Sequence, residues 1–224
     1  MEAREIAPEV RHFVFEVPGV RDFYFVPGQF VSLTQIIGGR EVTRAYSIAS
    51  APSGNRFELC LNRVQDGLLS PWLFTLEPGD EVETTAPLGY FVLRNPQRDA
   101  IFVATGTGIA PMRAMLTAWL GQDDPRELTL IFGVRYERGL LYREEFEELA
   151  RKHPKFRFWP TLSRPDPSWS GRTGHVQEHL GDAIKLTPDA DVYICGLKAM
   201  VDDVRAMLKG MGFDRKRIVY EKYD

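Results

Sequence analysis

Cysteine is scarce in this chain. Of 224 residues only two are cysteines, Cys60 and Cys195. Two widely separated cysteines provide no disulfide framework, which is typical of a protein kept in a reducing compartment. They are also too few for a cysteine-ligated iron–sulfur cluster, because such a cluster needs four ligands. We assign no metal site to the chain.

Long apolar runs and an excess of positive charge are also missing. No apolar run approaches the ~20 residues that cross a bilayer. Residues 1–17 alternate polar and apolar side chains and contain no continuous apolar core of signal-peptide length. The formal net charge of −3 argues against binding to nucleic acid, which normally requires a strong basic excess. We therefore expect a cytoplasmic protein without a membrane span and without a nucleic-acid partner.

The composition is that of a globular protein long enough for two domains, with 44% hydrophobic and 26% charged residues. The first half reads as all-β. Residues 12–17, 29–33 and 56–61 are short runs rich in aromatic and β-branched residues, separated by turn signals. This spacing predicts a small barrel or sandwich. A polar stretch at 94–99 suggests a linker, so we predict domains at residues 1–96 and 97–224.

The second half alternates buried strands with helices. Residues 100–104 form an unbroken apolar run, as expected of a strand covered on both faces. The same reasoning predicts further strands and the helices between them: strands at 128–132, 156–162 and 191–195, and helices at 111–120, 144–151 and 200–209. Strands alternating with helices predict a doubly wound parallel α/β sheet.

A glycine-rich turn follows the first of these strands. Gly106, Thr107 and Gly108 lead into a helix expected to open at Pro111. Glycines let the backbone approach a ligand, and unpaired N–H groups at a helix start attract phosphate. Proline suits the first helical turn. A nucleotide-binding loop and a plain strand–helix turn explain this segment about equally well.

Two segments of the first half carry candidate ligands for a phosphate-bearing molecule with a flat ring system. Arg44, Tyr46 and Ser47 offer a cation, an aromatic ring and a hydroxyl on one predicted strand, although an ordinary strand is the simpler interpretation of this segment alone. Gly67 precedes Ser70 and Pro71, which read as a helix N-cap and first helical position, and so as an anion site or a plain cap.

Cys195 and Gly196 end a buried strand of the second half. In an open α/β sheet, ligands bind beyond the carboxyl ends of the strands. A buried cysteine more often serves packing than chemistry, and we assign Cys60 to packing outright.

Together these motifs resemble the ferredoxin–NADP⁺ reductase family of flavoenzymes over essentially the whole chain. Four elements match in order: R-x-Y-S at 44–47, G-x-x-S at 67–70, G-T-G-I-A-P at 106–111 and C-G-L-K-x-M at 195–200. The resemblance implies an antiparallel Greek-key β-barrel that binds FAD, followed by a doubly wound parallel α/β domain that binds NAD(P). It also implies transfer of a hydride between nicotinamide and flavin, and release of electrons singly to a carrier.

The resemblance also implies residue roles. Arg44 and the helix start at Ser70, with Gly67, would hold the FAD pyrophosphate. Tyr46 would line the flavin, and Ser47 would bond its N5 atom. The loop of Gly106, Thr107, Gly108 and Pro111, with Cys195 and Gly196, would bind and place the nicotinamide.

The segment Tyr220-Glu221-Lys222-Tyr223-Asp224 departs from the plant-type pattern, which ends on the tyrosine, and looks closer to reductase components of bacterial oxygenases. The resemblance makes Tyr223 an aromatic cover for the flavin and Glu221 a proton relay. The 2′-phosphate of NADPH needs arginines, and Arg164 and Arg172 are the candidates, with Arg135 and Lys198 as further contributors. We lean to NADPH, while NADH is also compatible with the surrounding pattern.

The resemblance implies a ferredoxin, a flavodoxin or another one-electron acceptor protein as partner. Basic segments at 135–143, 151–157 and 215–217 would dock an acidic carrier, or are simply solvated faces, which we favour. Two alternatives stay open: a reductase component of a multi-component oxygenase, and a non-catalytic electron-transfer subunit of a larger complex. The acceptor, the direction of electron flow and the oligomeric state are not evident from the sequence.

Overall fold

A computed structural model describes residues 2–94, 97–120 and 126–223. The first half forms two three-stranded antiparallel sheets, in the orders β1-β2-β5 and β4-β3-β6. A bridge between Ile48 and Leu59 places β4 beside β5 and joins the two sheets. Strands β3, β4 and β5 are thus successive neighbours and β2 returns beside β5, which is a Greek key. The elements are β1 (Glu2–Ala7), β2 (Val10–Glu16), β3 (Phe30–Ile37), β4 (Arg40–Ser47), β5 (Arg56–Asn62), the short helix α1 (Leu69–Leu73) and β6 (Glu83–Thr84).

Side chains that alternate between the two faces of each strand explain the core of this barrel. Phe13 and Phe15 of β2 pair with Leu59 and Phe57 of β5, and all four side chains are buried. The rings of Phe15 and Phe57 stack at 5.3 Å. Cys60, on the opposite face of β5, is 5% exposed and packs into the core of the second half. Its assignment to packing is confirmed, and so is the Greek-key barrel.

The second half contains a six-stranded sheet, parallel throughout, in the order β10-β9-β8-β7-β11-β12. The order reverses between β7 and β11, so the predicted doubly wound fold is confirmed. Its elements are β7 (Ala100–Thr105), α2 (Ile109–Leu120), β8 (Leu128–Val134), α3 (Arg143–Lys152), β9 (Phe156–Leu162), β10 (Arg172–Thr173), α4 (Val176–Leu186), β11 (Asp191–Leu197), α5 (Lys198–Gly210) and β12 (Ile218–Tyr223), with 3₁₀ turns at Gly106–Gly108, Glu137–Gly139 and Arg215–Arg217.

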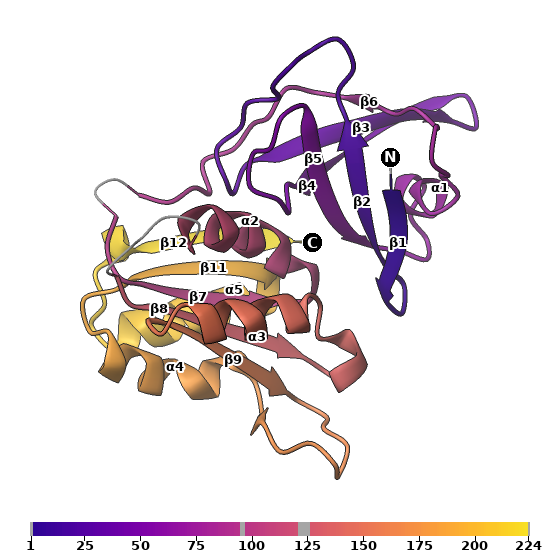
Figure 1. The fold of residues 1–224 in the computed structure, drawn as a ribbon. Helices are drawn as coiled ribbons and strands as arrows, with labels where there is room; N and C mark the ends of the chain where they lie inside the picture. Colours follow the sequence, from indigo (N-terminus) through magenta and orange to yellow (C-terminus); the bar gives the residue numbers. More distant parts are fainter. Residues whose placement is uncertain (1, 95–96, 121–125, 224) are drawn as a thin grey trace.

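The two faces of this sheet bury alternate residues. Phe102 of β7 packs with α2 and α3, whereas Ile101 and Val103 pack with α4 and α5. Figure 1 shows α2 and α3 on one face of the sheet and α4 on the other. Helix α4 was not among the predicted elements, although its buried residues Val176, Leu180 and Ala183 follow helical spacing.

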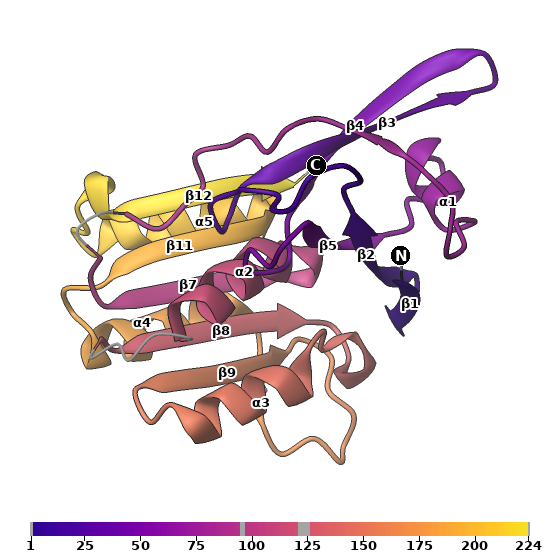
Figure 2. The same ribbon diagram turned by 45° about the horizontal axis from the view of Figure 1, so that its top comes forward.

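The second domain meets the barrel through α2, Tyr142 and the C-terminal end of β12. The C-terminal end of β12 lies beside the barrel in both views (Figures 1 and 2), and a hydrogen bond from Ser47 of β4 to Glu221 of β12 agrees with this placement. The predicted domain boundary at 96/97 involves residues 95–96, which lie outside the described residues. Among the described helices, none is long and apolar enough to cross a membrane.

Candidate active site

Four of the predicted catalytic residues meet where the two domains touch. Ser47 ends β4 of the barrel, Cys195 lies on β11, and Glu221 and Tyr223 lie on β12. The Ser47 hydroxyl donates a hydrogen bond of 2.9 Å to the Glu221 carboxylate, and the Tyr223 hydroxyl donates one of 2.6 Å to Ser47 Oγ. The structure therefore assembles a chain of donors that runs from Tyr223 through Ser47 to Glu221.

Strand register brings these residues together. In the parallel pair β11–β12, Cys195 is the partner of Glu221. Glu221 and Tyr223 are two residues apart on one strand, so their side chains leave the same face of the sheet, toward the barrel. Ser47 is 6% exposed and faces them.

Burial dominates the acid–base properties of the cluster. Burial raises the pKa of Glu221 above its ordinary value, and the hydrogen bond from Ser47 opposes this rise only in part. Burial, reinforced by the charge of Glu221, raises the pKa of the Cys195 thiol well above its usual range. The pKa of Tyr223 is raised well above normal, first by burial and then by Cys195 and Glu221. Cys195 therefore remains a neutral thiol, and Glu221 holds a proton more readily than an exposed carboxylate.

The glycine-rich turn lies directly beside this cluster. Gly106 has φ of +54°, and a side chain there would point into open space. At Gly108 a Cβ would lie 2.4 Å from the carbonyl oxygen of Cys195. The first glycine thus leaves room above the turn, and the second allows the turn to pack on β11. The helix begins at Ile109, so the prediction that it begins at Pro111 is wrong by two residues. Pro111 still lies in the first turn of the helix, where the N–H group that proline lacks would have no hydrogen-bond partner in the helix.

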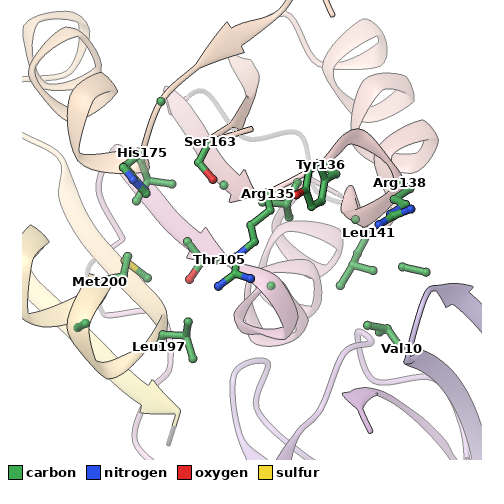
Figure 3. Close-up of a pocket in the computed structure, with 18 of the residues that line it drawn as sticks. Val10, Thr105, Arg135, Tyr136, Arg138, Leu141, Ser163, His175, Leu197 and Met200 are labelled. Atoms are coloured by element: carbon green, nitrogen blue, oxygen red, sulfur yellow. The ribbon is translucent and has the colours of Figure 1, made fainter. Parts of the chain in front are cut away.

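A cavity of about 610 Å³ opens at the carboxyl ends of β7, β8, β9 and β11. Figure 3 shows Thr105, Leu197 and Met200 on one side of it and Val10 of the barrel on the other. Thr105 Oγ1 is buried and has no hydrogen-bond partner among the described residues. Thr107 is half-buried and is not among the lining residues, which are Ala7, Pro8, Val10, Thr105, Gly106, Gly133, Val134, Arg135, Tyr136, Arg138, Gly139, Leu141, Ser163, Gly174, His175, Val176, Gln177, Leu197, Ala199, Met200 and Asp203.

The sequence indicates some of these lining residues but not others. Thr105 directly follows the predicted strand at 100–104 and precedes the glycine turn, where ligands bind in open α/β sheets. Ala7, Pro8 and Val10 come from the first turn of the barrel, and no local signal connects them to a site in the other domain.

The arginines around the cavity differ from the predicted pair. Arg135 and Arg138 line the cavity. Arg164 is exposed and lies outside the lining set. Arg172 stacks on the ring of Trp159, with its guanidinium carbon 3.9 Å from the ring centroid, and is likewise not a lining residue. The assignment of Arg164 and Arg172 to a 2′-phosphate stays a prediction.

The predicted flavin ligands lie on the barrel. Arg44 is exposed and bonds the backbone oxygen of Thr43 at 2.7 Å, with no carboxylate partner among the described residues. Tyr46 is half-buried, and burial raises its pKa to about 12 although Arg44 opposes the shift. Arg44 therefore keeps an available cation next to a fixed aromatic ring.

The prediction that Ser70 is a helix N-cap is wrong. Helix α1 begins at Leu69, with Leu68 as N-cap residue. Ser70 is 5% exposed, and its hydroxyl accepts a hydrogen bond of 2.9 Å from the backbone N–H of Val64. A carbon at Gly67 would come within 3.3 Å of that hydroxyl. Gly67 and Ser70 thus shape the turn that leads into α1, and their part in binding the FAD pyrophosphate stays a prediction.

These features fit two nucleotides. The barrel offers a cation with no carboxylate partner in the described part of the chain, an aromatic ring, and a hydroxyl at the domain contact, as a flavin requires. The sheet offers a cavity, a turn that leaves space for a phosphate, and a buried hydroxyl on the cavity wall that has no partner within residues 2–94, 97–120 and 126–223. Gly106 lines the cavity, and Gly108 of the same turn packs on the backbone of Cys195, so the cavity lies next to the cluster that contains Ser47.

Comparison with known proteins agrees with this division. Residues 1–93 match the family model described as "Oxidoreductase FAD-binding domain", and residues 102–206 match "Oxidoreductase NAD-binding domain". The chain is 43% identical to ferredoxin–NADP reductase B of Sorangium cellulosum, over 99% of this chain and 94% of that protein. The chain belongs to the ferredoxin–NADP⁺ reductase family. It is an FAD-dependent oxidoreductase that uses a nicotinamide nucleotide.

Other relatives serve different partners. The chain is 32% identical to the toluate 1,2-dioxygenase electron transfer component of Pseudomonas putida, over 89% of this chain and 59% of that protein. Among solved structures, an Amycolatopsis cytochrome P450 reductase superposes with a TM-score of 0.87 at 31% identity, over 99% of this chain and 67% of that one. In this family, similarity extends to oxygenase reductases as well as to ferredoxin–NADP reductases.

Proposed function

We propose that this protein transfers a hydride between NADPH and FAD and passes single electrons to a ferredoxin or flavodoxin type carrier. The observation that carries the proposal is the meeting of Ser47 from the barrel with Cys195, Glu221 and Tyr223 from the sheet, beside the glycine-rich turn. When bound, FAD supplies the conversion of a two-electron donor into one-electron steps.

The barrel residues have the properties needed to orient a flavin. Arg44 would hold the pyrophosphate by charge-assisted hydrogen bonds, since its guanidinium is exposed and unpaired with a carboxylate among the described residues. Tyr46 would lie against the ring system. Ser47 would donate to the flavin N5, and because a hydroxyl has one proton, this bond would replace its bond to Glu221.

The sheet residues have the properties needed to place the nicotinamide. Gly106 and Gly108 shape the turn, with Thr107 between them and Pro111 in the helix that follows. Gly196 follows Cys195 with φ of +147°, and a Cβ there would lie 2.4 Å from Oγ1 of Thr105, which lines the cavity. The neutral Cys195 thiol would fill space against the ring without adding charge. Glu221, whose pKa burial raises, would exchange a proton with Ser47. Bringing the two reacting atoms into contact supplies most of the rate acceleration in such a site.

Tyr223 is proposed to cover the flavin where the nicotinamide enters. Its hydroxyl bonds Ser47, so the ring occupies the space beside the proposed N5 contact. A nicotinamide would have to take this place for hydride transfer.

The acceptor proposal rests on relatives. The most extensive match named above carries the name ferredoxin–NADP reductase, which supports a ferredoxin or flavodoxin. A second candidate function, the reductase component of a multi-component oxygenase, is supported by the toluate dioxygenase component and by the phenol 2-monooxygenase reductase component of a Pseudomonas strain, 35% identical over 87% of this chain and 57% of that protein.

An anaerobic absorbance titration tests the donor side. Purified protein is titrated with NADPH and NADH in parallel, and we expect the yellow flavin absorbance to bleach, faster with NADPH. A colourless protein, or a flavin that neither nucleotide reduces, would contradict the proposal and leave a nucleotide-binding electron-transfer subunit. Reduced protein mixed with a ferredoxin, a flavodoxin or an oxygenase component then shows which carrier reoxidises it fastest.

A further inference from the structure

A charged side chain on α2 reaches from the nucleotide domain into the barrel. The Arg113 side chain is 14% exposed. The pKa of its guanidinium is raised overall: burial lowers it, whereas Glu145, Glu58 and Tyr142 raise it. A buried cation of this kind is stable only with good partners.

The partners of Arg113 come from both domains. On the barrel side, Nη1 donates to the backbone oxygen of Ala49 at 2.7 Å and to the carboxylate of Glu58 on β5. On the sheet side, Nε donates to both carboxylate oxygens of Glu145 on α3, each at 2.9 Å. The planar guanidinium thus joins two carboxylates and a carbonyl in one fixed geometry, which a lysine ammonium cannot reproduce.

Neighbouring side chains hold this arrangement in place. The Arg113 guanidinium lies 4.5 Å from the ring centroid of Tyr142. The Tyr142 hydroxyl is 2.9 Å from His12 Nδ1, and His12 Nε2 is 3.7 Å from the Glu58 carboxylate. His12 belongs to the barrel and Tyr142 precedes α3, so the hydrogen-bonded network crosses the domain contact twice.

Arg113 lies close in the chain to the glycine-rich turn, and its partner Ala49 lies close to Ser47. Ala49 lies two residues beyond Ser47. Arg113 lies one turn into the helix that follows the glycine-rich turn, and Gly108 of that turn packs on the backbone of Cys195. One side chain therefore connects the segment that carries Ser47 with the segment that carries the turn and Cys195.

Apolar contacts also join the two domains, but they fix the relative position of the domains less strictly than hydrogen bonds do. A Cβ at Gly28 of the barrel would lie 2.4 Å from the Cε of Met115 on α2, so the two domains touch closely at that point. A flexible methionine tolerates small shifts, whereas hydrogen bonds from a guanidinium depend on angle.

We propose that Arg113 is a positioning residue, which sets the separation of the two domains at the point where nicotinamide and flavin meet. This inference rests on the proposed hydride transfer. Displacing reacting groups by about 1 Å can slow a reaction by roughly a hundredfold.

The test is Arg113→Lys in the flavin-loaded protein, measured by anaerobic stopped-flow reduction with NADPH and NADH. We expect hydride transfer to slow by about tenfold or more, with flavin content and the nucleotide dissociation constant changed by less than about twofold. The long-wavelength charge-transfer absorbance between nicotinamide and flavin should weaken in parallel, because it depends on ring contact.

Arg157→Lys is the matched control. Arg157 pairs with Glu127 inside the nucleotide domain, at exposures of 31% and 33%. We expect it to leave hydride transfer unchanged, and equal slowing in both variants would overturn the positioning role. If Arg113→Lys fails to retain flavin, Glu58→Gln removes one barrel partner and leaves Arg113 in place; it should slow the same step.

The outcomes separate this inference from the proposed function. A native protein that neither nucleotide reduces would overturn both. A native protein that is reduced, with Arg113→Lys or its substitute Glu58→Gln reduced equally fast, would overturn the positioning role alone. A lowered melting temperature with an unchanged rate of hydride transfer would give Arg113 a purely structural role.

Discussion

Ser47 and Glu221 are separated by 174 positions in the chain, yet the Ser47 hydroxyl donates a hydrogen bond of 2.9 Å to the Glu221 carboxylate. One residue ends a strand of the barrel and the other lies on the edge strand of the parallel sheet. The bond therefore exists only when both domains are folded and docked. It places a proton donor and a buried carboxyl group at the proposed meeting point of flavin and nicotinamide.

Replacing Ser47 should affect chemistry more than binding. Ser47→Ala removes the donor proposed for flavin N5, and the loss of one hydrogen bond made in the reaction costs about tenfold in rate, or ~1.4 kcal/mol. We expect flavin content to stay near the native level while stopped-flow hydride transfer slows. An unchanged rate would remove the proposed N5 contact. Thr34→Ala, which removes an exposed hydroxyl on β3, serves as the control.

Glu221 should make stability depend on pH in an unusual direction. Burial raises its pKa above 4.5, so the folded protein holds this proton more tightly than the unfolded chain. The contribution is fully present below the unfolded value and is lost as pH rises through the folded value. The melting temperature of Glu221→Gln minus that of the native protein should therefore increase as the pH is raised from acid to neutral.

Glu148 provides the opposite case for this pH series. Its pKa is lowered by a hydrogen bond from Lys152, so any stabilisation it contributes is present above its ordinary pKa and is lost in acid. The melting temperature of Glu148→Gln minus that of the native protein should therefore decrease as the pH rises. A pH-independent difference for Glu221→Gln would show that its carboxyl group is not buried as described.

Two glycines should respond oppositely to alanine. In Gly108→Ala the new carbon meets backbone of β11 at 2.4 Å, which cannot move without displacing the turn. We expect a loss of about 1–3 kcal/mol in the free energy of unfolding. Gly181, within α4, has open space at its Cβ, and Gly181→Ala should be neutral or gain up to ~1 kcal/mol. Denaturant titrations measure both, and equal losses would contradict the close contact at Gly108.

Nucleotide preference can be tested at three arginines. Arg164→Ala should raise the Michaelis constant for NADPH more than that for NADH if Arg164 binds the 2′-phosphate. Arg135→Ala is the informative companion, because Arg135 lines the cavity and Arg164 does not. A selective effect at Arg135 and none at Arg164 or Arg172 would move the phosphate site to the end of β8. Steady-state kinetics with both nucleotides provide the measurement.

Much of the fold could be predicted because the spacing of apolar residues along the chain indicates which face of each strand or helix is buried. The apolar run at 100–104 forms most of β7, and the helix predicted at 111–120 is α2, which buries Met112, Met115 and Trp119. Local rules failed where a side chain had a competing partner. Ser70 looks like an N-cap in the sequence, but its hydroxyl bonds the backbone of Val64 instead.

The sequence by itself determined the order of the two domains, the position of the glycine-rich turn and the family, because these depend on residues close together in the chain. Tertiary structure alone decided that Arg113 joins Glu58 to Glu145, that Val10 of the barrel lines a cavity of the sheet, and that Arg172 stacks on Trp159. Such contacts depend on how separately folded units dock. The free energy of docking is spread over both surfaces, and no local pattern records it.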